Sequence, residues 1–153
     1  MLSSYTILAF VLGFLVAQTW KAVSDLAKNG KKGDAAQVKD FFSAVGYFAR
    51  SGGMPSGHMA SFTAAVVYLG CVYGFGSGLF MLGACVWTIV LYDAIHVRYA
   101  VGEQGKALNE ILKKAGKKAL PVVEGHTLAQ AAVGAIIGVV VGAGLFLIIK
   151  GGF

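Results

Sequence analysis

The segment SGGMPSGHMA, residues 51–60, brings a serine and a histidine to the entrance of an apolar stretch. Pro55 is suited to open a helix there, since its missing N–H would be unpaired in a first turn anyway. Free N–H groups at a helix start bind anions such as phosphate. The Ser56 hydroxyl and the Gly57 backbone would add to this cradle, and His58 could protonate a leaving oxygen. The segment predicts a phosphate-ester site, although an ordinary helix start can carry the same residues.

Further polar residues lie at the ends of other apolar runs. They are Gln18 and Lys21 at the end of the first run, Asp93, His96 and Arg98 after the third, and His126 before the fourth. Ionisable side chains at membrane depth are costly and usually mark function. A structural role stays open for each one, because Lys21 can extend to headgroups and Asp93 can pair with Arg98. Their convergence on one membrane face favours a functional site.

The elements that must position these residues are membrane spans. Hydrophobic residues make up 57% of the 153 residues and charged residues 13%, whereas soluble domains are about half apolar and about a quarter charged. A span needs about 20 apolar residues, and four runs approach that length: Ser3–Trp20, Met59–Phe75, Gly78–Tyr92 and Thr127–Ile149. We expect one domain, 1–153, that is an all-α integral membrane bundle of about four transmembrane helices plus interfacial helices. A cleaved signal peptide is the alternative for the first run, but no basic residue precedes it.

Positive charge predicts the orientation. Of the 13 Lys and Arg residues, 12 lie in the loops Lys21–Gly53 and Arg98–Gly125. With four spans these loops share one side, which the positive-inside rule assigns to the cytoplasm, together with the candidate site. Both termini are then outside, and Lys150 is a minor exception. Because the charge is divided between two loops that also contain acids, the net charge of +6 indicates membrane orientation and no nucleic-acid partner.

Two loop segments are expected to be helices at the membrane surface. One is Ala35–Ala49. The other lies in the basic insertion 106–124, where Leu108 and Ile111 share an apolar face opposite lysines. This pattern is typical of a basic interfacial helix attracted to anionic headgroups. A solvated helical hairpin is the alternative.

A stripe of small residues marks the last apolar run. Gly134, Gly138 and Gly142 recur every four residues, which lets helices approach closely in lipid. The stripe predicts helix packing, either within the chain or between the subunits of a homodimer.

Four motifs, in order, resemble the divergent branch of the type 2 phosphatidic acid phosphatase superfamily, which is related to acid phosphatases and vanadium haloperoxidases. AQTWK at residues 17–21 is similar to the first motif, Ala-Gln-x-x-Lys, and SGGMPSGH is similar to the second. DAIHVRYAVGEQGKALN at residues 93–109 is similar to the third motif, which includes a Gly-x-Gln that ends here at Gln104. GHTLAQAAVGAIIG, which begins at Gly125, is similar to the fourth.

This resemblance implies a mechanism through a phosphohistidine. His126 would be the nucleophile and His58 the general acid. The phosphate cradle would comprise Lys21, Ser56, Gly57 and Arg98, with Gln18, Gln104 and Gln130 in support. The resemblance implies no metal and no other cofactor. Such chemistry depends mainly on positioning and on neutralising the phosphate oxygens.

Several positions depart from the pattern of the wider superfamily. That pattern spaces arginine and nucleophile as Arg-x5-His, but here a long insertion separates Arg98 from His126. The wider pattern also has His-x-x-x-Asp, whereas position 130 is Gln. The Gln130 amide can orient the imidazole but stabilises its cation less than a carboxylate would. We expect Asp93 to supply the missing charge. His96 replaces a usual glycine.

The sequence therefore favours a membrane phosphatase that hydrolyses a lipid phosphate monoester or diphosphate at the cytoplasmic leaflet. Its partners would be a phosphorylated lipid and the surrounding membrane lipids, and a soluble phosphorylated substrate is a variant of this hypothesis. The alternative function is a non-catalytic lipid-phosphate or anion-binding membrane protein, or a transporter component. Metal-dependent hydrolysis is a weak third hypothesis, because no residue spacing resembles a metal site.

Overall fold

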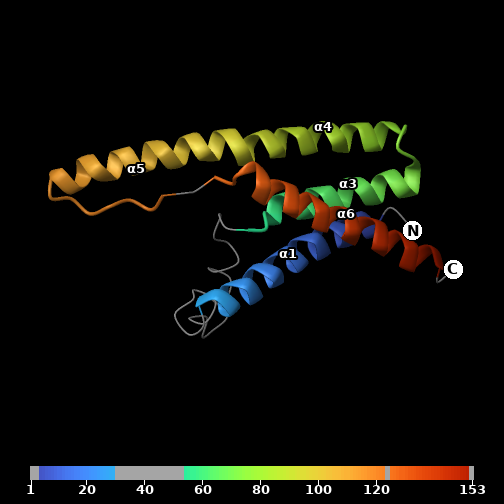
Figure 1. Ribbon diagram of the computed structural model, residues 1–153. Helices are drawn as coiled ribbons and strands as arrows, with labels where there is room; N and C mark the ends of the chain where they lie inside the picture. Colours follow the sequence, from blue (N-terminus) through green and yellow to red (C-terminus); the bar gives the residue numbers. More distant parts are fainter. Residues whose placement is uncertain (1–3, 30–53, 123–124, 152–153) are drawn as a thin grey trace.

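The computed structural model describes residues 4–29, 54–122 and 125–151 (Figure 1). In these ranges all regular structure is helical: α1 (Tyr5–Asn29), α3 (Gly57–Tyr73), α4 (Gly78–Tyr92), the π-helical turn η4 (Asp93–Val97), α5 (Arg98–Lys114) and α6 (Leu128–Gly151). The predicted all-α class is confirmed. The helix expected at Ala35–Ala49 lies outside the described residues.

Three helical stretches of the described chain are long and apolar enough to cross a membrane. They are Tyr5–Ala27, Gly78–Lys114 and Leu128–Gly151. The fourth apolar helix, α3, has 17 residues and is about 25 Å long at 1.5 Å per residue. The chain is thus a multi-pass membrane protein, as predicted, with one helix shorter than a typical span.

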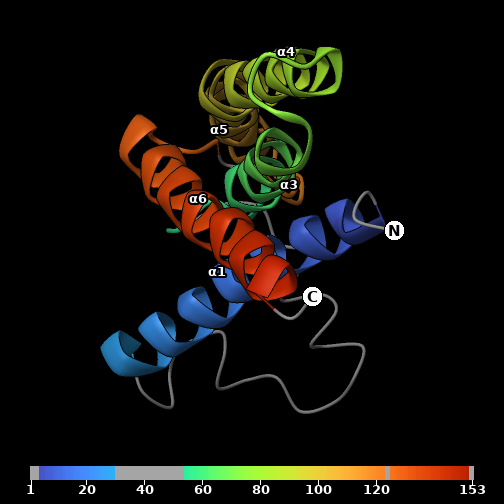
Figure 2. The same cartoon turned by 90° about the vertical axis from the view of Figure 1, so that its right-hand side faces the viewer.

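This short helix is the centre of the bundle. Helices α1, α4 and α6 all pack against α3 (Figures 1 and 2). Small side chains such as Ala60 and Ala64 on α3 are fully buried, as is the larger Tyr68. On the side of α4, the indole Nε1 of Trp87 donates a hydrogen bond to Thr63 Oγ1 at 2.7 Å. The surrounding helices therefore hold α3, whose first turn carries the candidate site.

The glycine stripe packs within the chain. A Cβ atom at Gly138 would lie 2.5 Å from the carbonyl oxygen of Ala60, and Gly134 and Gly142 approach α3 carbonyls just as closely. All three are buried on the face of α6 that contacts α3. Close packing was predicted for this stripe, and α3 rather than a second copy occupies it.

Helices α4 and α5 form one continuous rod with η4 at its middle (Figure 1). The rod has 37 residues and is about 55 Å long, whereas the hydrocarbon core is about 30 Å thick. The basic segment is helical as far as Lys114, and this helix continues α4 instead of beginning separately. Its lysine-rich end projects beyond the other helices (Figure 1).

The chain then returns along α5 towards the bundle. The side chain of Asn109 makes two hydrogen bonds to the backbone of Leu120, accepting from its N–H at 2.8 Å and donating to its carbonyl at 2.9 Å. Nearer the bundle, a Cβ atom at Gly105 would lie 3.3 Å from the Val122 side chain. The insertion is therefore an arm that leaves the bundle and comes back along its own helix.

Candidate active site

His126 lies between the returning arm and α6, and its backbone contacts η4. Its N–H donates a hydrogen bond to the carbonyl of Ala94 at 3.0 Å. The preceding Gly125 approaches the α5 backbone so closely that a Cβ atom there would lie 2.5 Å from the backbone nitrogen of Tyr99. The side chain is buried, with 5% of the residue exposed. Residues distant in sequence thus fix His126 next to the start of α5.

The first turn of α6 orients the His126 ring. Thr127 and Gln130 form a reciprocal capping box, in which Gln130 N–H donates to Thr127 Oγ1 at 3.3 Å and Thr127 N–H donates to Gln130 Oε1 at 3.0 Å. The same Oε1 lies 3.4 Å from His126 Nδ1. An amide oxygen only accepts, so this contact favours the tautomer with hydrogen on Nδ1 and a free lone pair on Nε2. Gln130 therefore caps the helix and also contacts the candidate nucleophile.

The surroundings lower the pKa of His126 below its ordinary value of 6.5. Burial is the main cause, because it disfavours the charged ring. The hydrogen bond to Gln130 raises the pKa, while the positive charges of His58, Lys21 and Arg98 lower it further. A lowered pKa keeps the ring neutral at pH 7, which is the form of histidine that can act as a nucleophile.

The PSGH segment forms the start of α3. The helix begins at Gly57, with Ser56 as its N-cap, so Pro55 precedes the helix instead of opening it. Ser56 is fully buried and its Oγ accepts a hydrogen bond from Met59 N–H at 3.4 Å. Its own N–H donates to the carbonyl of Gln130 at 3.2 Å. The start of α3 is therefore joined to the first turn of α6.

His58 follows at the second position of α3 and is exposed at the end of the bundle. At the first two positions, Gly57 and His58, the N–H groups have no acceptor within the helix. The charges of Arg98 and Asp93 act on the His58 ring, and the His58 charge in turn acts on His126. The two histidines, one from α3 and one before α6, thus belong to one electrostatic cluster.

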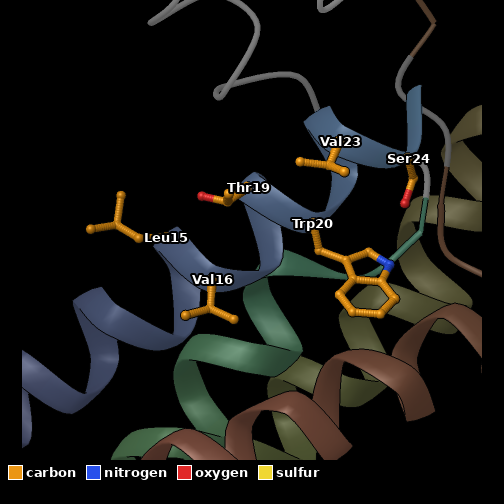
Figure 3. A pocket seen from close by; sticks show the side chains of 6 residues that line it. All are labelled: Leu15, Val16, Thr19, Trp20, Val23 and Ser24. Carbon is orange, nitrogen blue, oxygen red and sulfur yellow. The ribbon is translucent and has the colours of Figure 1, made fainter. Parts of the chain in front are cut away.

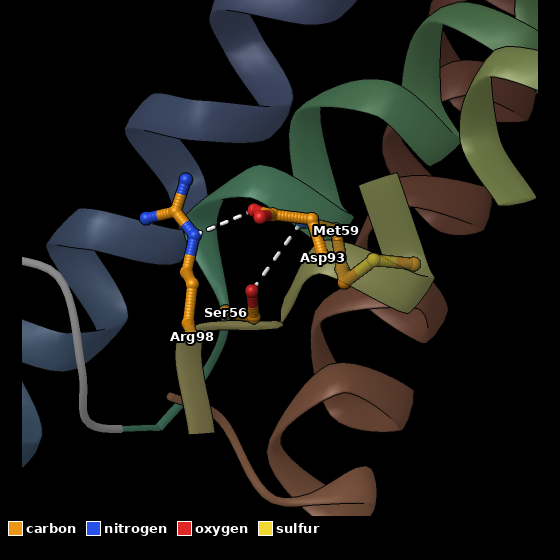
Figure 4. A network of polar contacts seen from close by, with 4 residues as sticks. All are labelled: Ser56, Met59, Asp93 and Arg98. Atoms are coloured by element: carbon orange, nitrogen blue, oxygen red, sulfur yellow. Dashed lines mark hydrogen bonds and ion pairs between the residues drawn. The ribbon is translucent and has the colours of Figure 1, made fainter. Parts of the chain in front are cut away.

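Arg98 enters this cluster from η4 and α5. Its Nε atom donates to Asp93 Oδ2 at 2.6 Å (Figure 4). Both side chains are partly exposed, 31% for Arg98 and 41% for Asp93. Of the two roles that the sequence leaves open for Asp93, the structure shows the ion pair with Arg98. In Figure 4 the guanidinium lies at the start of α3, near Ser56.

Helix α1 contributes Gln18 and Lys21. A Cβ atom at Gly57 would lie 3.5 Å from Gln18 Nε2, so this amide reaches the first turn of α3. Gln18 is buried, with 6% exposed, and Lys21 is half-buried. Both have polar or electrostatic partners in the structure. Lys21 is close enough for its charge to act on His126.

Two sequence candidates lie away from the cluster. Gln104 is exposed on α5, six residues beyond Arg98 and about 9 Å further along the helix. The ring of His96 stacks on Tyr92, with centroids 4.6 Å apart, and Tyr92 is 59% exposed. Replacement of the usual glycine by His96 thus places an aromatic pair on the outer side of the α4–η4 rod.

A separate hollow of about 460 Å³ lies along α1 (Figure 3). Its lining is mostly apolar: Leu15, Val16, Thr19, Trp20, Val23 and Ser24. Neither His58 nor His126 lines this hollow.

Within the described ranges, no three His, Cys, Asp or Glu side chains gather as metal ligands would.

Sequence reasoning assigned no role to three residues that fix the position of His126: Ala94, Gly125 and Thr127. The Thr-x-x-Gln spacing at 127–130 is a readable capping-box signal. The roles of Ala94 and Gly125 depend on contacts between segments about 30 residues apart, for which the sequence carries no signal.

The fold and this cluster define a multi-pass helical membrane protein with a polar, cationic site at one end of its bundle. A family model described as "Divergent PAP2 family" matches residues 2–141. The chain belongs to this family.

One relative is the "Uncharacterized membrane protein YuiD" of Bacillus subtilis (strain 168), to which the chain is 37% identical over 62 residues. That match covers 40% of the chain and 39% of the relative, and the relative's printed name states no activity. No solved structure matches the chain.

Proposed function

We propose that this protein is a metal-independent phosphatase that hydrolyses the phosphate monoester or diphosphate of a lipid through a phosphohistidine. The main support is the environment of His126. The ring is buried, its pKa is lowered, and the charges of Lys21 and Arg98 act on it, together with that of His58 when His58 is protonated. A neutral nucleophile among cations suits attack on an anionic phosphorus centre.

In the first step, the Nε2 lone pair of His126 attacks phosphorus. A bond forms between nitrogen and phosphorus while the bond from phosphorus to the leaving oxygen breaks. The protonated ring of His58 gives its proton to that oxygen, so the lipid leaves as an alcohol or as a lipid monophosphate. Arg98 and Lys21 balance the charge of the remaining phosphate oxygens.

In the second step, water attacks the phosphohistidine. His58, now neutral, accepts a proton from the water, and the new oxygen–phosphorus bond replaces the nitrogen–phosphorus bond. Inorganic phosphate leaves, His126 is again neutral and His58 is again protonated. Gln130 contacts Nδ1 throughout and keeps Nε2 directed at the phosphate.

The substrate is a lipid because the site lies at the end of an apolar bundle. Helix α3 starts beside the polar cluster and continues as an apolar segment, so a headgroup can bind while its hydrocarbon remains in the bilayer.

The basic residues of α5 extend from the same end of the bundle as the site, which supports a cytoplasmic site. The orientation can be tested by labelling a single cysteine introduced in place of Lys117, in a variant that lacks Cys71 and Cys85. Labelling only by reagent added from the periplasmic or external side would contradict a cytoplasmic site.

The assay for the proposed activity is phosphate release from a panel of lipid phosphates by detergent-purified protein. The panel contains phosphatidate, a phosphatidylglycerophosphate-type lipid, isoprenoid phosphates and diphosphates, and soluble phosphate esters. We expect release from at least one lipid, loss of release in His126→Ala, and no effect of chelator. Equal rates for the wild type and His126→Ala would exclude His126 as the nucleophile.

A second candidate function is non-catalytic binding of lipid phosphates or anions. Gln130 favours it, because an amide stabilises an imidazolium less than a carboxylate does and so makes the covalent intermediate less favourable. Tight binding of phosphate or vanadate, with no hydrolysis of any lipid in the panel, would support this function over the enzyme.

A further inference from the structure

The ion pair between Asp93 and Arg98 depends on the π-turn η4. The two residues are five apart, and in a regular α-helix such residues lie about 140° apart around the axis. In η4 the Arg98 N–H instead bonds to the carbonyl of Asp93, five residues back, as in a π-helix. The wider turn brings both side chains to one face, where Nε and Oδ2 are 2.6 Å apart.

This pairing uses only one edge of the guanidinium. Arginine has five N–H donors, of which Nε carries one and the two terminal nitrogens carry four. Asp93 binds at Nε, and in Figure 4 the terminal nitrogens point away from the carboxylate. Four donors in a planar fork suit the oxygens of a phosphate.

The same turn also holds the backbone of the candidate nucleophile. The carbonyl of Ala94, the second residue of η4, accepts the hydrogen bond from His126 N–H at 3.0 Å. Gly125 meets the backbone at Arg98 and Tyr99 in close contact. One short irregular segment therefore sets the position of Arg98 relative to His126.

We propose that Asp93 is a positioning residue for Arg98, held in register by η4, and that it directs the terminal nitrogens of Arg98 to a phosphate on His126. The inference rests on the proposed function and changes the role expected for Asp93. Its carboxylate acts through Arg98 and contributes no charge to the nucleophile.

A double-mutant cycle on vanadate binding tests this role. Vanadate is a phosphate mimic whose affinity can be measured by calorimetry without turnover, on wild type, Asp93→Ala, Arg98→Ala and the double variant. We expect Asp93→Ala to weaken vanadate about 10-fold or more, the scale of one hydrogen bond to a charged group. In the Arg98→Ala background the same change should cost much less, because Asp93 acts mainly through Arg98.

A merely structural role for Asp93 would give a different result. The loss caused by Asp93→Ala would then be equal in the two backgrounds, and this additivity would overturn the inference. Asp93→Asn is the second variant, because its amide oxygen can still accept from Nε. It should recover part of the affinity lost in Asp93→Ala, and no recovery would also count against positioning.

Glu103→Ala is the matched control. It removes a carboxylate from an exposed ion pair with Lys106 on the same helix and should leave vanadate affinity unchanged. Failure of the proposed function is distinguishable: a wild type that binds neither vanadate nor phosphate has no such site, and the inference falls with it. If the wild type binds vanadate but the double-mutant cycle is additive, only the positioning role of Asp93 is contradicted.

Discussion

The backbone N–H of His126 donates a hydrogen bond to the carbonyl of Ala94, 3.0 Å away. The arm between these two residues extends outward along α5 and returns. The insertion therefore lengthens the superfamily's short Arg–His spacing in sequence without separating the two residues in space. Arg98 and His126 are far apart in sequence but adjacent in the fold, since Gly125 contacts the backbone at Arg98 and Tyr99.

The far end of the arm should therefore be dispensable for catalysis. Replacement of residues 111–118 by a short Gly-Ser linker removes the lysine-rich tip but keeps the hydrogen bonds between Asn109 and Leu120. We expect kcat to stay within about twofold of wild type, since less than 0.5 kcal/mol would be lost at the site. A loss of about 100-fold with normal thermal stability would show that the tip contributes to the reaction.

Replacement of His58 tests the general acid. We expect His58→Ala to slow the hydrolysis of an alkyl phosphate by roughly 10²–10⁴-fold. A substrate with an acidic leaving group, such as p-nitrophenyl phosphate, should lose less because its leaving oxygen needs no proton. His96→Ala is the control, since His96 stacks on Tyr92 outside the cluster. Equal losses on both substrates would contradict the role of His58.

The pH profile of the wild type follows from the lowered pKa of His126. The ring must be neutral to attack, and burial shifts its pKa below 6.5. Activity should therefore persist as pH falls to 6.5 and decline only at lower pH, when the ring gains a proton. The acidic limb of kcat/KM measures this, because it reports groups of the free enzyme. An acidic limb above pH 6.5 would contradict the assignment.

Gln130→Glu should move the acidic limb of the pH profile to higher pH. A carboxylate beside Nδ1 favours the imidazolium, so it should raise the pKa of His126. Thr127→Val is the matched control, because it removes the other half of the capping box and leaves Gln130 beside the ring. It should cost about 1 kcal/mol of stability without moving the limb. The same shift in both variants would assign the effect to the helix cap.

The sequence predicted the elements well and their junctions less well. The presence and apolarity of α1 and α6 follow from hydropathy. The predicted end of the first run at Trp20 is too early, because α1 continues to Asn29. The π-turn does not follow from the sequence, because a single five-residue turn leaves no readable periodicity. Without it the sequence leaves two roles open for Asp93, an ion pair with Arg98 and a charge contribution to His126, and does not choose between them. The continuation of α4 into α5 was also missed, because the change from apolar to basic residues resembles a loop boundary.

The glycine stripe gives a prediction about stability. Gly138→Val would place side-chain atoms against the Ala60 carbonyl and Thr63, where even a Cβ atom has only 2.5 Å. We expect a loss of about 1–3 kcal/mol through overpacking, measured as a lower Tm in detergent. Gly144→Ala is the control on the same helix, since a Cβ atom there meets nothing within 4 Å. Equal Tm values for the two variants would contradict the packing of α6 on α3.

Trapping of the covalent intermediate tests the central claim most directly. Purified protein is mixed with a radiolabelled lipid phosphate that it hydrolyses and is quenched in alkali, where phosphohistidine survives. The account predicts label on the peptide that contains His126, and none in His126→Asn. Turnover that continues in His126→Asn, or label on another residue, would contradict it.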